Sequence, residues 1–570
     1  MEVRVKLIEV ENGTAKIFFD YEVSLVSAVK QIATARFSRG PSRHWIVKLN
    51  ATTVEQLESF ASDYGFSTDS RLVAVFEEFR VSALESVAAS HAKNAEIAIS
   101  GLGGELRPFQ RAGTAYALAK KRTFIADEMG LGKTVQALAT LQAAQAFPAL
   151  ILCPASLKLN WKREAEKWIP GRTVSVLNGK NTDAMFGADI LILNYDNLKK
   201  NLERLLGLGL RSVVADESHY LKNFKAQRTE AAKKICSKCE YRIFLTGTPL
   251  LNRPQELLSQ LGAIGRLDDL GGFWPFAKRY CRAYQSKWGW DMSGAAHLDE
   301  LNQKLRATCY VRRNKADVLT ELPAKQRANQ TVEISNRAEY QRAEKSLIAW
   351  LRESVANDAE FLRSIAGMSS AEQKAAKNAR ADEAEQKGKR AERLVKIEAL
   401  KRLAARGKLE AAQEWIESFL ETGEKLVVFA WHKEIVAAVA DMFHCDSITG
   451  DTPLDKRQAY VDKFQNDPSA KIIVLNIQAG GVGLTLTAAS NVLFLELGWN
   501  PGVHDQAEDR CHRIGQESQV TAWYLLAQQT IDDKIYDLIE SKRAVVDAAT
   551  EGGEAEKSGI VSGLVEQLIA

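Results

Sequence analysis

The stretch FIADEMGLGKTVQALATLQAA, residues 124–144, decides the architecture of this chain. A short apolar run leads into a loop that contains two glycines, and apolar residues at helical spacing follow the loop. Between a strand and the N-terminus of a helix, backbone N–H groups and the helix dipole together favour a bound phosphate. The stretch therefore predicts a nucleotide-binding strand–loop–helix unit within an α/β sheet.

Within this loop, Lys133 would reach the terminal phosphates of ATP and Thr134 would hold Mg²⁺ through its hydroxyl. The sequence departs from the phosphate-loop pattern GxxxxGK[ST] at its first position, where Asp127 replaces glycine. The ATP-binding residues predicted here are Asp127, Glu128, Met129, Gly130, Leu131, Gly132, Lys133 and Thr134.

On both sides of the loop, short apolar runs alternate with helical stretches. In the first half the further runs are 149–154, 189–196, 212–217 and 242–249, and the alternation resumes at 425–432, 471–478, 491–499 and 520–530. Continuous apolar strands that end in polar turns are typical of parallel sheets covered by helices on both faces. We therefore expect an α/β fold with one lobe over 101–333 and another over 421–548.

Three further segments complete the expected organisation. Residues 334–420 are rich in Ala, Glu, Lys and Arg and predict a helical insertion. Residues 1–85 predict a small α+β domain, joined to the first lobe by a linker at 86–100. Residues 549–570 form a tail with one short apolar segment.

An acidic pair follows the apolar run at 212–215, in the sequence DESH. Two adjacent carboxylates at a strand end would be costly if they were buried without partners. We expect Asp216 to order the Mg²⁺ shell and Glu217 to orient and deprotonate the attacking water. A solvated acidic turn is the alternative, and the preceding phosphate loop argues against it.

A third element lies in the second lobe, in DQAEDRCHRIGQ, residues 505–516. Arg510 and Arg513 are three residues apart, so on a helix they would project from one face. Two such guanidinium groups can neutralise charge that develops on the γ-phosphate. On spacing alone, an ordinary surface helix with salt bridges is the better interpretation.

Composition restricts the class of protein. The net charge of +4 permits a nucleic-acid partner only if local basic patches supply the attraction. No apolar run is long enough to cross a bilayer, and the seven cysteines suit a reducing compartment, so we expect a cytoplasmic protein, nucleoid-associated if bacterial or phage-encoded. Cys236 and Cys239 form a CxxC without a second ligand pair nearby, and buried free thiols are the favoured interpretation.

Taken in order, LRPFQ (106–110), DEMGLGKT, DESH, LTGTP (245–249) and RCHRIGQ (510–516) resemble the motif series of superfamily-two helicases of the Swi/Snf type. The resemblance covers about residues 101–547. It implies two RecA-like parallel-sheet lobes with a helical insertion, preceded by a small α+β domain. It also implies ATP and Mg²⁺ as cofactors, with ATP between the lobes and DNA as the partner.

The resemblance assigns further roles. Gln110 would contact the adenine, Gly483 and Gln506 would complete the ATP site, and Arg510 and Arg513 become arginine fingers. Thr246 and Gly247 would couple hydrolysis to lobe movement. The DNA contacts that it implies are Lys158, Asn160, Trp161, Asn194, Tyr195, Lys456, Arg457, Gln478 and Gly480.

A finer resemblance connects residues 276–327 and 18–50 with the HepA-related annealing-helicase subgroup and its HARP module. It implies action at forks and single-strand/duplex junctions, with rewinding rather than unwinding. Arg36, Arg39, Arg43 and Lys48 would then bind phosphates, and Phe37 or Trp45 would stack on a base. The equally weighted alternative is that Phe37 and Trp45 are core residues and that the four basic residues form a solvated rim around them.

Two other functions remain open. In the first alternative, the chain is a motor that removes a protein such as RNA polymerase from DNA. A catalytically silent DNA-binding scaffold is the alternative of another class, but it predicts damage among Lys133, Asp216, Glu217, Arg510 and Arg513, and all five are present.

Overall fold

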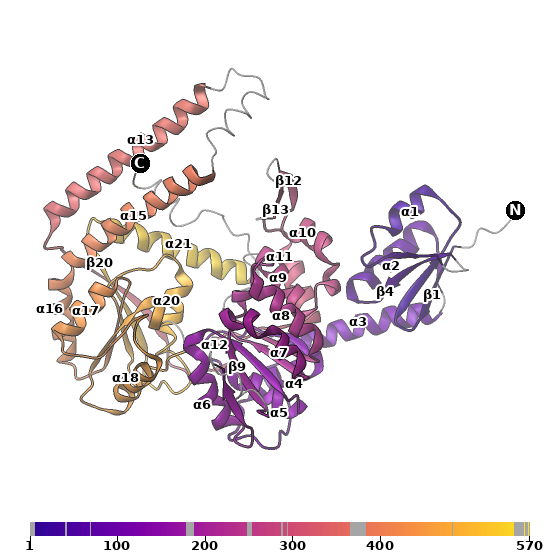
Figure 1. The fold of residues 1–570 in the computed structure, drawn as a ribbon, viewed down its shortest axis with the longest axis horizontal. Coiled ribbons are helices and arrows are strands. Elements are labelled where there is room, and N and C mark those ends of the chain that lie inside the picture. The colour runs from indigo at the N-terminus through magenta and orange to yellow at the C-terminus, as the bar shows by residue number, and fades with distance from the viewer. Residues whose placement is uncertain are drawn as a thin grey trace. The chain divides into compact units, whose positions relative to one another are not determined.

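The computed structural model describes residues 6–39, 43–68, 70–177, 187–247, 254–286, 289–292, 294–364, 383–480, 483–551, 564 and 568. The chain divides into two compact units (Figure 1). The first comprises Met1–Thr320 with Ala548–Glu554, and the second comprises Glu321–Asp547 with Ala555–Ala570. Each unit contains one predominantly parallel α/β lobe.

The first unit begins with a small α+β domain, as the sequence predicts. Its five-stranded sheet has the order β3-β4-β2-β1-β5. Ile8, Ile17 and Val47 point from this sheet into a core that also contains Leu57 and Phe60. The elements are β1 Leu7–Glu11, β2 Thr14–Phe18, α1 Val23–Val29, β3 Arg36–Ser38, β4 His44–Lys48, α2 Ala51–Tyr64 and β5 Ser67–Thr68.

Helix α3, Ser70–His91, connects this domain to the first lobe. Two buried serines near its end contact the lobe: Lys120 donates to Ser86, and Arg306 Nη1 lies 3.4 Å from Ser90 Oγ. Residues 86–91, expected to be linker, are therefore helix that packs on the lobe. The small side chains of Ser86 and Ser90 permit this packing.

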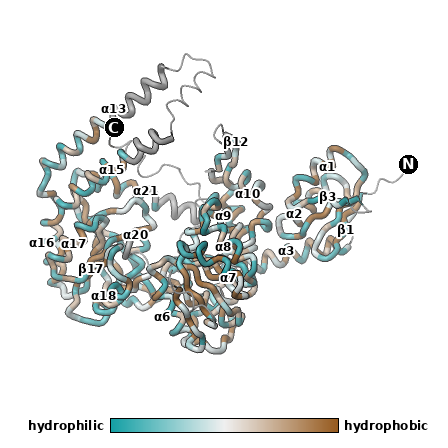
Figure 2. The backbone as a smooth tube through the Cα atoms, in the orientation of Figure 1, coloured by the Kyte–Doolittle hydropathy of each residue, from teal (hydrophilic) through white to brown (hydrophobic). Residues whose placement is uncertain are grey.

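The first lobe contains a seven-stranded sheet of order β14-β6-β11-β10-β7-β9-β8, and every pair in it is parallel. Figure 2 shows the hydrophobic segments concentrated in this sheet. The strands are β6 Arg122–Ile125, β7 Ala149–Cys153, β8 Val174–Val176, β9 Ile190–Asn194, β10 Ser212–Ala215, β11 Tyr241–Leu245 and β14 Tyr310–Val311. The helices are α4 Pro108–Lys120, α5 Lys133–Ala144, α6 Lys158–Trp168, α7 Leu202–Gly207, α8 Gln227–Lys238, α9 Pro254–Ile264, α10 Phe273–Tyr280, α11 Leu298–Thr308 and α12 Lys315–Val318, with a hairpin of β12 Tyr284–Ser286 and β13 Gly289–Asp291.

The second lobe contains a six-stranded parallel sheet of order β15-β20-β19-β16-β18-β17. Its strands are β15 Lys325–Val332, β16 Leu426–Ala430, β17 Ser447–Ile448, β18 Ile472–Asn476, β19 Asn491–Phe494 and β20 Val520–Ala527. Its helices are α17 Lys433–Met442, α18 Leu454–Asn466, α19 Ile477–Gly480, α20 Pro501–Glu508 and α21 Ile531–Glu551. The expected helical insertion is present as α13 Arg337–Ser364, α15 Glu383–Gly407 and α16 Leu409–Leu420.

Strand β15 moves the boundary between the lobes. It pairs in parallel with β20 along its whole length, so residues 325–332 belong to the second sheet. The sequence places them in the first lobe, which is wrong, because β15 is an edge strand of mixed polar composition and carries no apolar run. The second unit accordingly begins at Glu321.

The insertion and the C-terminal segment both contribute to the second unit. Lys401 of α15 is 2% exposed and donates to the carbonyl of Leu497 at 2.9 Å. In the C-terminal segment, Leu564 and Leu568 are buried within the second-lobe core. These two leucines of the tail therefore pack against this lobe.

The cysteines of the CxxC are core residues. Cys236 and Cys239 are buried within the first lobe, and burial raises the pKa of the Cys236 thiol to about 12. No helix in the described part of the chain is both long and apolar enough to cross a bilayer.

Candidate nucleotide site and nucleic-acid contacts

The phosphate loop lies between β6 and α5, as the sequence predicts. Gly130 and Gly132 have φ values of 83° and 74°, which favour glycine. A Cβ at Gly132 would lie 2.5 Å from Nε2 of Gln110. Gln110 itself is 3% exposed and donates to the carbonyl of Leu131 at 3.3 Å. Gln110, predicted to contact the base, thus also holds the loop backbone.

Asp127 has a structural role in this site. Its carboxylate is fully buried and accepts from Arg313 at 3.0 Å and 2.6 Å and from Gln136 Nε2 at 2.9 Å. The sequence assigned Asp127 to ATP binding, but its side chain ties the loop to the segment after β14. One signal in the sequence could have indicated a cationic partner, because an acid at a position that normally has glycine needs a cation once it is buried.

The ammonium group of Lys133 lies against the loop backbone. Its Nζ donates to the carbonyls of Asp127 at 2.8 Å and Glu128 at 3.3 Å. Burial lowers the pKa of Lys133, while the negative charges of Glu217 and Asp216 oppose that shift. The cation therefore faces both the loop and the acidic pair.

Asp216 is held on three sides at the end of β10. Trp161 Nε1 donates to its Oδ2 at 2.8 Å, and the Glu217 N–H donates to its Oδ1 at 2.9 Å. The Tyr195 hydroxyl donates to its carbonyl at 2.6 Å. Burial and the neighbouring Glu217 raise the pKa of Asp216 to about 6. Such a perturbed acidic pair beside a lysine is typical of a catalytic site.

Glu217 adopts an uncommon backbone conformation, with φ of 49° and ψ of 54°. A residue with a side chain is strained in this region, and such strain concentrates at functional sites. One carboxylate oxygen of Glu217 lies 3.3 Å from His219 Nδ1.

The predicted coupling residues lie close to the loop. Thr246 is fully buried, and its N–H donates to Ile125 of β6 at 3.3 Å. A Cβ at Gly247 would lie 2.5 Å from Cγ of Met129 and 3.4 Å from Nζ of Lys133. A displacement of residues 246–247 would therefore change the contacts that Met129 and Lys133 of the phosphate loop make.

The expected metal site can be assessed from its donors. The described residues contain no group of three His, Cys, Asp or Glu side chains placed to hold a metal. Thr134 and Asp216 nevertheless fit Mg²⁺, which commonly takes one or two protein oxygens together with substrate phosphates and water.

In the second unit, Arg510 and Arg513 lie in the turn after α20, because this helix ends at Glu508. The expectation that they share a helix face is therefore wrong. Arg513 Nη1 donates to Thr485 Oγ1 at 3.0 Å, and His512 Nε2 lies 2.9 Å from the Pro323 carbonyl oxygen. The other predicted ATP contacts are half-buried: Gly483 with φ of 76°, and Gln506 on α20.

A buried ionic network anchors α20 to β15. The carboxylate of Glu508 is fully buried and accepts from Lys325 at 2.8 Å, Arg327 at 2.7 Å and the Tyr524 hydroxyl at 2.8 Å. Although burial opposes it, the charges of Lys325 and Arg327 hold the pKa of Glu508 well below its usual range. Neither basic residue was singled out in the sequence, because β15 was not predicted.

The predicted DNA contacts of the first lobe are mostly buried. Trp161 is 0% exposed and Tyr195 is 2% exposed, and both bond to Asp216. Lys158 is 7% exposed and donates to the Leu177 carbonyl at 3.2 Å. Asn194, also 7% exposed, accepts from Asn197, whereas Asn160 is half-buried. Of these side chains, Trp161 and Tyr195 position the acidic pair through Asp216.

The predicted DNA contacts of the second lobe are more accessible. Lys456 on α18 and Gln478 on α19 are exposed, and Gly480 is the last residue of α19. Arg457 donates to the carbonyls of Thr449 at 2.8 Å and Gly450 at 2.9 Å, so it shapes the loop before α18.

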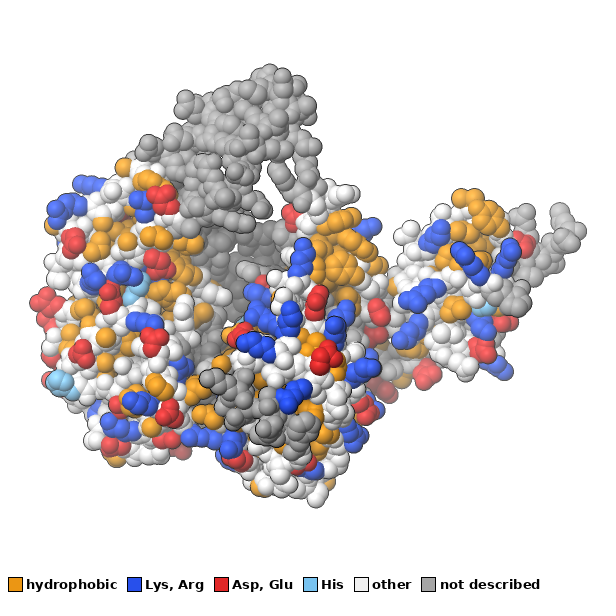
Figure 3. Space-filling view, viewed as in Figure 1, with side chains coloured by type: hydrophobic (Ala, Val, Ile, Leu, Met, Phe, Trp, Pro, Cys, Tyr) orange, Lys and Arg blue, Asp and Glu red, His pale blue; other side chains and the backbone are white. Residues whose placement is uncertain are grey.

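The N-terminal domain presents the basic residues that the sequence singled out. Arg36, Arg39, Arg43 and Lys48 are exposed. Phe37 is 48% exposed, and its ring centroid lies 5.4 Å from that of Trp45, which packs in part against the core. Figure 3 shows Lys and Arg side chains on the visible face of this domain.

Two protein families match the chain. The SNF2-related domain matches residues 44–389, and the helicase conserved C-terminal domain matches residues 407–515. The first match begins inside the N-terminal domain and includes the first lobe, and the second covers most of the second lobe.

Curated relatives share about a third of their residues with the chain. A Xenopus tropicalis protein named SWI/SNF-related matrix-associated actin-dependent regulator of chromatin subfamily A-like protein 1 is 34% identical over 460 residues, which are 79% of this chain and 45% of that protein. DNA annealing helicase and endonuclease ZRANB3 of Mus musculus is 34% identical over 474 residues, which are 80% of this chain and 41% of that protein. The chain thus spans less than half the length of these relatives.

Among solved structures, the Sulfolobus solfataricus SWI2/SNF2 ATPase core in complex with dsDNA is similar at 25% sequence identity. The match covers 80% of this chain and 95% of that chain, with a TM-score of 0.38.

Proposed function

The chain belongs to the SNF2-related family, and from this membership we propose that it is a DNA-dependent ATPase that translocates on DNA. One observation carries the proposal: Lys133, Asp216 and the strained Glu217 lie together at the phosphate loop of the first lobe. A silent scaffold would have no reason to maintain a half-buried acidic pair beside a half-buried lysine.

In the proposed mechanism, the phosphates of ATP lie against the N-terminus of α5. Lys133 exchanges its bonds to the Asp127 and Glu128 carbonyls for phosphate oxygens. Thr134 and Asp216 would hold Mg²⁺, which when bound neutralises charge on the phosphates. Glu217 accepts a proton from the attacking water. Arg510 and Arg513 would stabilise the charge that develops on the γ-phosphate.

The contacts of Asp216 suggest how DNA would stimulate hydrolysis. Trp161 and Tyr195 belong to the segments expected to approach DNA, and both donate to Asp216. We propose that DNA phosphates displace these segments slightly and thereby reposition Asp216 and Glu217. Trp161→Phe removes one donor, so it should weaken DNA stimulation more than the basal rate.

The finer proposal concerns the form of DNA. Relatives of this chain include proteins named DNA annealing helicases, and the N-terminal domain exposes Phe37 beside four basic residues. We propose that the chain acts at forks and single-strand/duplex junctions in replication or repair, and promotes rewinding. Phosphate contacts carry no sequence information, so little sequence preference is expected.

Steady-state ATP hydrolysis tests the proposal. It is measured without nucleic acid and with single-stranded DNA, duplex, forked DNA and RNA, for the natural chain and for Glu217→Gln. Strong stimulation by forked DNA, reduced at least a hundredfold in the variant, supports the motor and the junction preference. Equal stimulation by plain duplex removes the junction preference, and no DNA-dependent hydrolysis contradicts the motor.

A further inference from the structure

Two tryptophans of the first lobe lie together at the surface. Trp274 on α10 and Trp290 on β13 are each 43% exposed, and their ring centroids are 4.5 Å apart at an interplanar angle of 52°. Tryptophan is usually highly buried, so two adjacent exposed indoles from different elements need an explanation. Phe273, half-buried, supports Trp274 edge-on at 5.2 Å and fixes the position of its ring.

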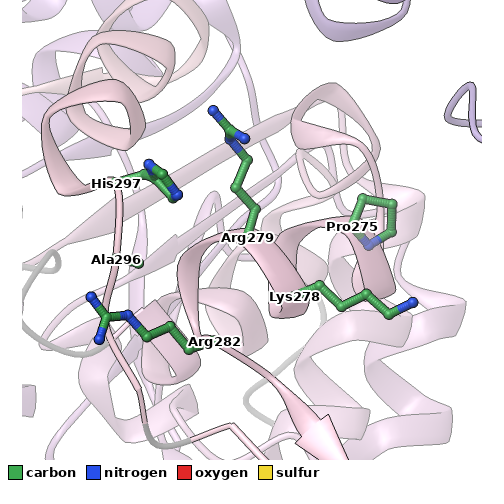
Figure 4. Close-up of a pocket in the computed structure, with 6 residues that line it drawn as sticks. All are labelled: Pro275, Lys278, Arg279, Arg282, Ala296 and His297. Carbon is green, nitrogen blue, oxygen red and sulfur yellow. The ribbon is translucent and has the colours of Figure 1, made fainter.

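A basic pocket adjoins this pair. It has a volume of about 480 Å³, and no carboxylate is among the described residues that line it. Figure 4 shows Arg282 and His297 on the same side of the pocket, with Ala296 between them. The lining residues are Pro275, Lys278, Arg279, Arg282, Ala296 and His297.

Trp274 and part of the pocket lining share helix α10. Pro275 follows Trp274 directly, and Lys278 lies four residues after Trp274, so the two side chains are neighbours on the surface of α10. Figure 3 shows hydrophobic side chains gathered over α10 and the β12–β13 hairpin, with basic side chains at their border. A ligand on the indoles therefore reaches the basic pocket within one helical turn.

The pocket has a defined geometry. Arg279 is fixed by Glu300, with Nε at 2.8 Å and 3.1 Å from the two carboxylate oxygens. Arg282 and His297 have φ values of 48° and 51°, which are strained for residues with side chains. Lys278 and Arg282 are exposed, so their charges are available to an anionic ligand.

We propose that Trp274, Trp290, Lys278 and Arg282 form a single-strand site, at which the indoles stack on unpaired bases and the two cations hold the adjoining phosphates. Flat rings beside positive charge suit single-stranded nucleic acid, because every base offers a face to stack on and every nucleotide carries a phosphate. Plain duplex keeps its bases stacked inside and offers only phosphates. The inference rests on the proposed function, since it specifies the single-stranded part of a junction substrate.

Fluorescence anisotropy of the full chain tests the single-strand site. A labelled oligothymidine and a duplex of equal length are titrated with the natural chain, Trp274→Ala, Trp290→Ala and Lys278→Ala/Arg282→Ala. Trp274→Phe is the conservative variant, because it keeps an aromatic ring that can stack on a base. Tyr21→Ala, at an 83% exposed aromatic, and Lys238→Ala, at an exposed lysine of α8, are matched controls.

Each tryptophan-to-alanine change should weaken oligothymidine binding about tenfold, while duplex binding changes less than about twofold. Trp274→Phe should recover most of the loss, and the cation double variant should reduce the salt dependence of single-strand binding. The single-strand site is overturned if oligothymidine binding is unchanged in the variants, or if the variants lose affinity equally for both DNAs. The exposed indoles would then be interpreted as a contact surface for a protein partner. If the natural chain binds neither DNA, the proposed function fails instead.

Discussion

At the scale of single residues, the side chain of Met129 occupies the space that a methyl group on Gly247 would need. Gly247→Ala would place Cβ 2.5 Å from Cγ and 2.7 Å from Cε of Met129. Because Met129 belongs to the phosphate loop, we expect DNA-stimulated hydrolysis to fall roughly tenfold to a hundredfold. Thermal unfolding should change little, since methionine is flexible. Adding Met129→Ala should restore turnover, and a double variant as slow as Gly247→Ala would contradict this explanation.

His432 gives the second residue-scale prediction. Burial lowers its pKa, but Glu398 at 3.3 Å and Glu496 outweigh burial and raise the pKa to about 9. Folding therefore favours the protonated ring, and this contribution is complete below about pH 6.5. It declines as the pH rises and is lost above about pH 9, a change of at most about 3 kcal/mol.

Thermal unfolding at pH 6.5 and pH 9.5 measures this effect. The natural chain should lose several degrees of second-unit stability over this range, and His432→Gln should lose less. Parallel pH dependence in both chains would contradict the assignment.

The candidate site could be predicted only in part from the sequence. The residues that could be predicted belong to local motifs, in which the role of each residue follows from its neighbours in the chain. They are Lys133, Thr134, Asp216 and Glu217. Arg313 could not be assigned its role, because its hydrogen bond to Asp127 joins residues that are 186 positions apart. For the same reason, Trp161 was read as a DNA contact and not as a donor to Asp216.

At the scale of elements, β15 anchors α20 through ion pairs to Glu508, and a substitution of Arg327 tests this anchoring. Glu508 is fully buried, so Arg327→Met leaves its carboxylate with fewer charged partners. We expect the second unit to lose about 3–5 kcal/mol of unfolding free energy. Turnover should also fall, because the turn that carries Arg510 and Arg513 follows α20 directly.

Denaturant titration measures the loss, and Arg406→Met is the matched control. Arg406 also binds a glutamate, Glu434, but its side chain is 56% exposed. An exposed pair contributes at most about 1 kcal/mol. Equal losses for the two variants would show that the buried network does not stabilise the unit.

Elements were predictable where a strand is buried on both faces. Such strands read as continuous apolar runs, and all nine runs of the two lobes contain strands. Edge strands β8, β14, β15 and β17 escaped prediction because they are short or polar and need a neighbour on one side only. The end of α20 was also missed, since no glycine or proline marks it.

At the scale of the whole molecule, the fold class was confirmed, with two RecA-like lobes, a helical insertion and a small domain in front. The boundaries were less predictable, because they depend on pairing between distant segments. The C-terminal segment is an example: the sequence shows one short apolar segment in the tail, but only the structure assigns Leu564 and Leu568 to the second-lobe core.

These two leucines give the whole-molecule prediction. Leu564 is 0% exposed and Leu568 is 3% exposed, so alanine at either position should cost about 2–5 kcal/mol of second-unit stability. Calorimetry should show one unfolding transition move while the first-unit transition stays in place. Leu84→Ala, at a 72% exposed position, should leave both transitions unchanged. Unaltered transitions in Leu564→Ala would contradict the docking.

The pairing of β15 with β20 has a consequence for biosynthesis. Gln326 and Thr521, which face each other in this pair, are 195 residues apart. At ribosomal rates of about 5–20 residues per second, the nascent strand waits roughly 10–40 seconds for its partner. During this interval the backbone N–H and C=O groups of β15 are unpaired, and a strand of another nascent chain can pair with them. Lys325 and Arg327, which later secure Glu508, also give that edge the positive charge that discourages such aggregation.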